Sequence, residues 1–183
     1  MGVHLVYETH ATTEDNENGV ATGWLPGRLS VAGRRQAEDL GGRRRGTGVA
    51  AVYASDLARA VDTARIAFGD SDIPVHLDAR LRECDYGRLN GAPVADMARQ
   101  RRWCVDEPFP GGQSYRDVVD ATRSFLADLV RDHDGESVVV VSLSANRWAL
   151  QHLLEGTPLE DLVDAPFDWR PGWDYTVPPA PLA

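Results

Sequence analysis

The chain has 183 residues, of which 43% are hydrophobic and 26% are charged, as in an ordinary globular protein. This length is enough to bury a core, and we expect one domain across residues 1–183. The formal net charge is −9, and the 19 basic residues are all arginine, which suggests a bacterial coding sequence of high GC content. Only residues 43–45 cluster basic charge, and we interpret them as a solvated helix end. This balance excludes an extended basic surface for nucleic acid.

Membrane and metal-binding features are also missing from the sequence. No apolar run approaches the roughly 20 residues of a membrane helix, and the N-terminus does not resemble a signal peptide. Cys84 and Cys104 make no disulfide framework, and the cysteines and histidines lack metal-ligand spacing. We therefore expect a cytoplasmic protein with no cofactor, metal, nucleic-acid or membrane partner. Its expected partner is a small-molecule substrate, and a homodimer is compatible with the sequence.

Strand and helix patterns alternate along the chain. Short apolar runs predict strands, and apolar residues at helical spacing predict helices. Ser30 and Ser114 stand where two of these helices begin and can cap them. The predicted strands cover residues 3–8, 49–54, 73–77 and 137–142, and the predicted helices cover 30–41, 57–68, 94–103, 114–133 and 146–154. Residues 166–183 form an aromatic, proline-rich tail that we expect to wrap the domain with little regular structure. The alternation predicts a three-layer α/β/α sandwich around a mostly parallel sheet.

Polar loops follow the first and last predicted strands. The first loop carries Thr9, His10, Thr12 and Asn16, and the second loop carries Leu143 and Ser144 in residues 142–147. Because parallel strands present reactive groups beyond their carboxyl ends, both loops are expected at one substrate site.

The order of several motifs resembles that of the histidine phosphatase superfamily, the phosphoglycerate mutase-like proteins. The matching stretches cover roughly the first 155 residues in order, and five of them in sequence are specific for the fold. They are residues 9–13 with Asn16, residues 29–37, residues 53–64, residues 81–91 and residues 110–114. The resemblance implies that His10 becomes phosphorylated, that Arg59 clamps phosphate and that Glu83 is a general acid. A neutral imidazole, an arginine fork and a partly buried carboxyl are suited to these roles.

The chain departs from the family pattern at several positions of the implied phosphate pocket. Thr9 stands in place of the first arginine, Thr12 in place of a glutamate, and Leu143 in place of the second histidine; Gln113 replaces a further glutamate. Phosphoryl transfer depends on neutralising charge on the phosphate oxygens. Unless Arg82, Arg147 or Asn146 compensates, we expect an ordinary phosphomonoesterase reaction to be impaired.

Each candidate residue also has a structural interpretation. His10 could be satisfied by Thr12 or Asn16, Arg59 could pair with Asp56 or Asp62, Glu83 could cap a loop, and Leu143 could be core.

The sequence leaves three functions open for this chain. The first is acid–base chemistry by His10 and Glu83 on a small organic metabolite, for example in bacterial secondary metabolism, with Arg59 and residues Thr9, Thr12, Asn16, Leu143 and Ser144 holding the substrate. The second is a weak or specialised phosphomonoesterase acting through phospho-His10, and the third is a binding or regulatory protein without catalysis.

Overall fold

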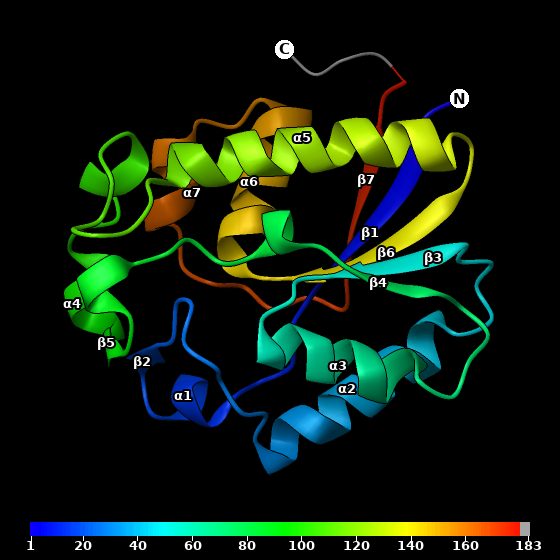
Figure 1. The fold of residues 1–183 in the computed structure, drawn as a ribbon, viewed down its shortest axis with the longest axis horizontal. Helices are drawn as coiled ribbons and strands as arrows, with labels where there is room; N and C mark the ends of the chain where they lie inside the picture. Colours follow the sequence, from blue (N-terminus) through cyan, green and yellow to red (C-terminus); the bar gives the residue numbers. More distant parts are fainter. Residues whose placement is uncertain (180–183) are drawn as a thin grey trace.

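The computed structural model, which describes residues 1–179, has a five-stranded sheet with helices on both faces (Figure 1). The strands are β1 Val3–Thr9, β2 Val20–Ala21, β3 Ala51–Ala54, β4 Val75–Leu77, β5 Ala92–Pro93, β6 Ser137–Ser142 and β7 Trp173–Val177. The α-helices are α1 Glu14–Glu17, α2 Val31–Arg44, α3 Ala58–Phe68, α4 Val94–Ala98, α5 Tyr115–His133, α6 Ser144–Glu155 and α7 Leu159–Asp164. Short 3₁₀ turns lie at Ala79–Leu81, Gly87–Leu89 and Trp103–Val105.

The order of strands in the main sheet is β4-β3-β6-β1-β7. β4, β3, β6 and β1 are parallel to one another, and β7 runs antiparallel to β1 at the edge. The register pairs Thr9 with Ser142, so β1 and β6 end together and release their loops at the same edge. The predicted α/β class with a mostly parallel central sheet is confirmed.

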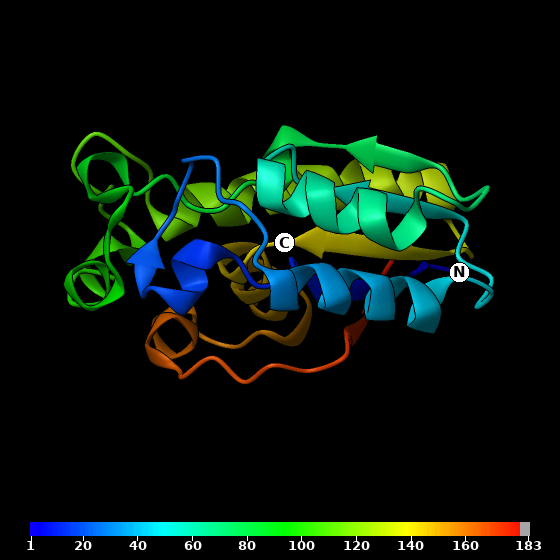
Figure 2. The same ribbon diagram turned by 90° about the horizontal axis from the view of Figure 1, so that it is seen from below.

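The helices form two layers. α2 and α3 lie side by side against one face of the sheet, and α5 and α6 cover the other (Figures 1 and 2). Ser30 and Ser114 cap α2 and α5 as predicted, because each hydroxyl accepts a backbone N–H from the first helical turn. Buried apolar side chains of β1, β3 and β6 lie between the layers and hold the sheet in place.

Two parts of the chain differ from the predictions. Tail residues 173–177 form strand β7, so the expectation of little regular structure is wrong for them, and the part of the tail beyond residue 179 lies outside the described residues. The apolar side chains of this strand alternate, and pairing with β1 buries Tyr175 and Val177.

The polar helix predicted at 94–103 ends at Ala98, and a 3₁₀ turn follows at Trp103–Val105. α1, β2, β5 and α7, which the sequence did not predict, gather at one end of the molecule (Figure 2).

The arginine triplet is not simply a solvated helix end. Arg43 and Arg44 pair with the buried carboxylate of Glu8 at 3.1 and 2.8 Å. Arg44 also donates to the carbonyl of Pro171 at 2.9 Å, so it links α2, β1 and the chain before β7.

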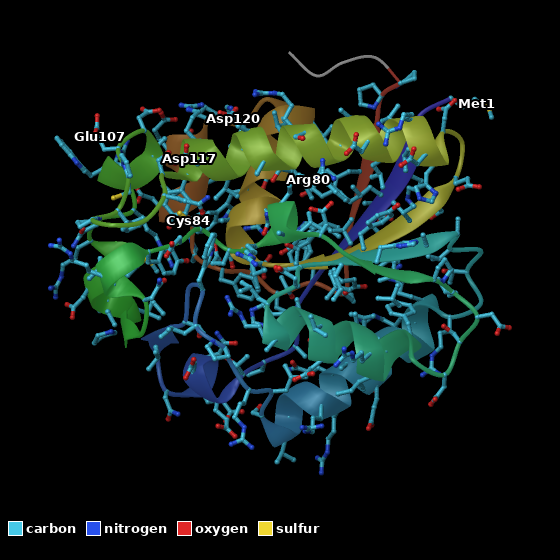
Figure 3. The ribbon with its side chains drawn as sticks, viewed as in Figure 1. Met1, Arg80, Cys84, Glu107, Asp117 and Asp120 are labelled. Carbon is cyan, nitrogen blue, oxygen red and sulfur yellow. The ribbon has the colours of Figure 1, made fainter. Side chains whose placement is uncertain are left out.

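A second arginine joins a loop to a helix. Arg80, labelled in Figure 3, pairs with Asp78 and with Asp128 of α5, each at 2.7 Å. This contact fixes the segment that leads to Glu83. Within residues 1–179, none of the helices has the length and apolar character needed to span a lipid bilayer.

Candidate active site

His10 lies directly after β1, and its backbone N–H donates to the carbonyl of Ser142 at 2.9 Å. The imidazole Nδ1 lies 2.8 Å from the carbonyl oxygen of Ala11. Because a carbonyl can only accept, this contact assigns the proton to Nδ1 and leaves a lone pair on Nε2. Burial, assisted by the nearby charge of Arg59, lowers the pKa of His10 to about 3 against the opposing effect of the Ala11 carbonyl. His10 is therefore a neutral imidazole at physiological pH.

Glu83 follows the 3₁₀ turn Ala79–Leu81 and is buried, with only 7% of its surface exposed. Its Oε1 accepts backbone N–H groups from Cys84 at 2.9 Å and from Ala145 at 3.3 Å (Cys84 is labelled in Figure 3). Burial raises the pKa of Glu83, and the Cys84 hydrogen bond, Arg59 and Arg101 only partly oppose this effect. Since Oε1 already accepts two N–H groups, Oε2 is the atom that would carry a proton.

Arg59 enters the site from the first turn of α3 and is buried, with 3% of its surface exposed. Two of its terminal N–H groups donate to loop carbonyls, at 2.7 Å to Gly23 and at 3.2 Å to Leu25. Burial lowers the pKa of Arg59, and the charge of Glu83 opposes this shift. The guanidinium thus supplies positive charge, but two of its donors already have partners.

Two cavities meet at His10, Asn16 and Ser144. The inner cavity has a volume of about 110 Å³ and is lined by Arg59, Glu83 and Arg101 in addition to these residues. The outer cavity has a volume of about 300 Å³. Its other lining residues are Thr9, Thr12, Gln36, Phe167 and Trp169.

Of the eight residues predicted to act on or hold the substrate, seven line one or both of these cavities and Leu143 lines neither. It is fully buried, and its carbonyl accepts the Tyr7 hydroxyl at 2.6 Å. The structure therefore favours the core interpretation for this side chain over a place at the substrate. Its backbone still matters, because it begins α6 and thereby directs the N–H of Ala145 at Glu83.

The local alternatives for His10 and Arg59 are not what the structure shows. His10 contacts the Ala11 carbonyl, and Asn16 instead accepts the backbone N–H of Thr13 in the capping box of α1. Arg59 donates to Gly23 and Leu25, and Asp56 pairs with Arg82. Both side chains therefore remain directed to the cavity.

The three residues considered as replacements for the missing phosphate ligands are engaged elsewhere. Arg82 is held by Asp56 at 2.7 and 2.6 Å and lies over the ring of Trp24. Arg147 lies over Trp173, and Asn146 contacts Ser142 in the core. None of the three lines either cavity.

Sequence reasoning missed Arg101, which lies in the turn after α4 and lines the inner cavity. Its guanidinium lies 5.5 Å from the centre of the Trp148 ring. Its Nε is buried and has no hydrogen-bond partner among the described residues. Its charge lowers the pKa of Glu83 and of Tyr86 against stronger burial effects. No local motif marks this residue, because only the fold brings residue 101 to residue 83.

The aromatic residues of the tail, which we expected to wrap the domain, have two different surroundings. Trp173 and Tyr175 do pack, within β7. Trp169 instead lines the outer cavity together with Phe167, whose role the sequence did not indicate. Within residues 1–179, no group of three or more His, Cys, Asp or Glu side chains is arranged to hold a metal ion.

Comparison with known proteins agrees with this architecture. The chain is 31% identical over 166 residues to phosphoserine phosphatase 1 of Hydrogenobacter thermophilus, covering 86% of this chain and 78% of that protein. It is 32% identical over 178 residues to a 2,3-bisphosphoglycerate-dependent phosphoglycerate mutase of a Methylobacterium species, covering 86% and 83%. The structure of Bacillus stearothermophilus YhfR superposes with a TM-score of 0.83 at 28% identity, covering 92% of this chain and 88% of that one. The family model for the histidine phosphatase superfamily, branch 1, matches residues 9–169, and the chain belongs to this superfamily.

Proposed function

We propose that this chain is an enzyme that transfers protons on a small anionic organic metabolite, with His10 as the base and Glu83 as the acid. The observation that carries this proposal is that His10 and Glu83 line one inner cavity, where burial shifts their pKa values in opposite directions. The pKa of His10 is lowered to about 3, and that of Glu83 is raised, so the imidazole is held neutral while the carboxyl keeps its proton to higher pH. The usual order of the two pKa values is thus reversed, and such opposed environments are the usual basis for assigning a base and an acid.

The substrate itself would strengthen the base. Arg59 lowers the pKa of His10, and an anion bound beside Arg59 would offset that charge. The pKa of His10 would then rise by the part of the shift that Arg59 causes, and the imidazole would accept protons more readily, while burial, the larger cause, would still hold the pKa below its ordinary value. Arg101 would contribute a second positive charge at the same cavity.

A phosphomonoesterase reaction through phospho-His10 is the second candidate. The free lone pair on Nε2 supports it, as do the phosphatase and mutase names of the relatives. The supply of charge is the argument against it. Thr9 and Leu143 provide none, Arg59 has already committed two donors to Gly23 and Leu25, and Arg101 adds one further charge at the inner cavity. Loss of one well-placed donor costs about 3 kcal/mol in comparable sites, so an efficient reaction with phosphate monoesters is not expected.

One experiment separates these candidates. The purified protein, His10→Ala and Glu83→Gln are incubated in D₂O with a panel of 2-oxo acids and 3-oxo acids, and deuterium incorporation at the carbon beside the carbonyl is followed by NMR. In parallel, each protein is given 4-nitrophenyl phosphate. His76→Ala, at an exposed strand residue that lines neither cavity, is the matched control.

Proton exchange that requires both His10 and Glu83, with an inert aryl phosphate, supports the proposal. Turnover of the aryl phosphate that is lost in His10→Ala, with a phosphohistidine trapped on His10, would overturn it in favour of the phosphatase. Ligand binding without either reaction would assign the chain to the class of binding proteins.

A further inference from the structure

The two cavities at His10 differ in charge. The inner cavity is lined by the ionisable groups of Arg59, Arg101 and Glu83, whereas the described residues that line the outer cavity include no charged side chain, since His10 is neutral. The outer cavity combines hydroxyl and amide groups with the rings of Phe167 and Trp169. A ligand that fills both cavities therefore meets positive charge at one end and aromatic surface at the other.

The two aromatic side chains are unusually exposed for their size. Phe167 is 55% exposed and Trp169 is 54% exposed, whereas Phe109 and Tyr115 of the core are 1% exposed. They lie two positions apart in the irregular segment between α7 and β7, and both line the same cavity. In an extended chain, residues at this spacing lie on the same side. The segment thus presents two rings to the cavity rather than to the core.

Contacts on either side fix this segment in place. Arg44 donates to the carbonyl of Pro171 while pairing with Glu8, and β7 pairs with β1 directly after the segment. α7, which precedes it, is buried through Leu159 and Val163. Both ends of the segment are therefore fixed to the domain, and binding need not first order a free tail.

Resting on the proposed function, we infer that the substrate is a planar aromatic or conjugated organic anion. Its anionic group enters the inner cavity beside Arg59 and Arg101. Its planar part occupies the outer cavity against Phe167 and Trp169. Aromatic rings bind planar π systems by offset or edge-to-face contact, and the outer cavity of about 300 Å³ falls at the lower end of the range for small-molecule sites.

The test compares carboxylates of equal charge and different shape. Binding of 2-naphthoate, of its saturated analogue decahydro-2-naphthoate and of acetate is measured by calorimetry. The proteins are the wild type, Phe167→Ala, Trp169→Ala, Trp169→Phe and the matched control Trp103→Ala. Trp103 is 76% exposed and lines neither cavity, so its removal tests a general effect of losing a surface tryptophan.

The expected result is tighter binding of 2-naphthoate than of the saturated acid. Phe167→Ala and Trp169→Ala should each weaken naphthoate binding about fivefold to tenfold and leave acetate binding unchanged. Trp169→Phe should keep most of the affinity, and Trp103→Ala all of it. Equal binding of the planar and saturated acids, or unchanged naphthoate binding by Trp169→Ala, overturns the inference.

This measurement does not depend on turnover. If the aromatic variants behave as expected but no proton exchange is found, the proposed function fails and the inference about the ligand stands. If exchange is found on aliphatic oxo acids while the aromatic variants bind normally, the inference fails and the proposed function stands.

Discussion

The backbone N–H of Ala145 donates to Oε1 of Glu83 at 3.3 Å and so connects the first turn of α6 with a loop 62 residues earlier. Cys84 donates to the same oxygen at 2.9 Å. Both donors favour a charged carboxylate, yet burial is the larger effect and the pKa of Glu83 is raised. One oxygen is thus fixed by the backbone, and the other is available to carry and deliver a proton.

Glu83→Gln tests this assignment, because an amide keeps an acceptor for the two N–H groups but cannot donate an acidic proton. If Glu83 is the acid, kcat for proton exchange should fall by about 10²–10⁴-fold. In contrast to kcat, the free energy of unfolding should be higher in Glu83→Gln than in the wild type at neutral pH. A raised pKa means that the folded state binds more protons than the unfolded state, so wild-type stability falls as pH rises from about 4.5 through the raised value. Glu83→Gln lacks this loss.

Thermal unfolding of both proteins across pH 4–8 checks the linkage. The variant should gain stability relative to the wild type as pH rises. A difference that is independent of pH would show that Glu83 titrates as an ordinary carboxyl.

His10 gives a linkage of the opposite sign. Its pKa in the folded state is about 3, against 6.5 when unperturbed, so the folded state binds fewer protons between these values. The stability that depends on a neutral His10 is present above pH 6.5 and is lost as pH falls towards 3. Relative to His10→Ala, the wild type should lose about 2–3 kcal/mol of unfolding free energy between pH 7 and pH 4.5.

Denaturant unfolding of the two proteins at both pH values measures this difference. NMR of the imidazole nitrogens provides an independent check, since His10 should remain neutral at pH 5. Added inorganic phosphate should raise its pKa by offsetting Arg59. An imidazole that is already protonated at pH 6 without ligand would contradict the assignment.

The sequence predicts the framework well because the framework depends on local signals. The valine run of β6 gives a strand with the predicted bounds 137–142, and the Ser114 cap begins α5 where expected. His10 is visible as a candidate because it follows a predicted strand, whereas Glu83 is indicated by the resemblance of residues 81–91 to a family motif. These features need only neighbouring residues to be visible.

The missed features depend on contacts between distant residues. β7 exists because Trp173–Val177 pairs with β1, about 170 residues earlier in the chain, and prolines on both sides conceal it. Arg101 lies in a polar stretch with ordinary composition, and only the fold brings it to the cavity of Glu83. Leu143 matches a family site position, but its side chain is in the core. A motif fixes the place of the backbone, and packing decides where the side chain goes.

Leu143→His tests whether the side chain at position 143 must stay in the core. Leu143 is fully buried, so an imidazole there would lose hydration without a designed partner. We expect a loss of about 2–4 kcal/mol in unfolding free energy, measured by denaturant titration. Leu143→Met, which preserves volume, should cost less than about 1.5 kcal/mol. If the histidine costs no more than the methionine, the side chain at this position has turned into the cavity.

Arg44 holds the segment that carries Trp169, and Arg44→Met should both destabilise and loosen the protein. The side chain of Glu8 is only 3% exposed, and removal of Arg44 leaves it with Arg43 alone. Removing the sole partner of a buried carboxylate costs more, so losing one of its two partners should lower the free energy of unfolding by about 1–3 kcal/mol. The carbonyl of Pro171 also loses its donor, so amide hydrogen exchange in residues 167–172 should accelerate.

Arg131→Met is the matched control, because Arg131 is 66% exposed and its pairs with Asp128 and Asp132 are screened by solvent. Its loss should change the unfolding free energy by less than about 1 kcal/mol and leave exchange near residue 169 unchanged. If Arg44→Met accelerates exchange there while α5 stays protected, the position of Phe167 and Trp169 at the outer cavity depends on the local contact of Arg44. Naphthoate binding should then weaken in Arg44→Met as it does in Trp169→Ala, although Arg44 lines neither cavity. Uniform acceleration across the whole chain would instead show that Arg44 contributes only to global stability.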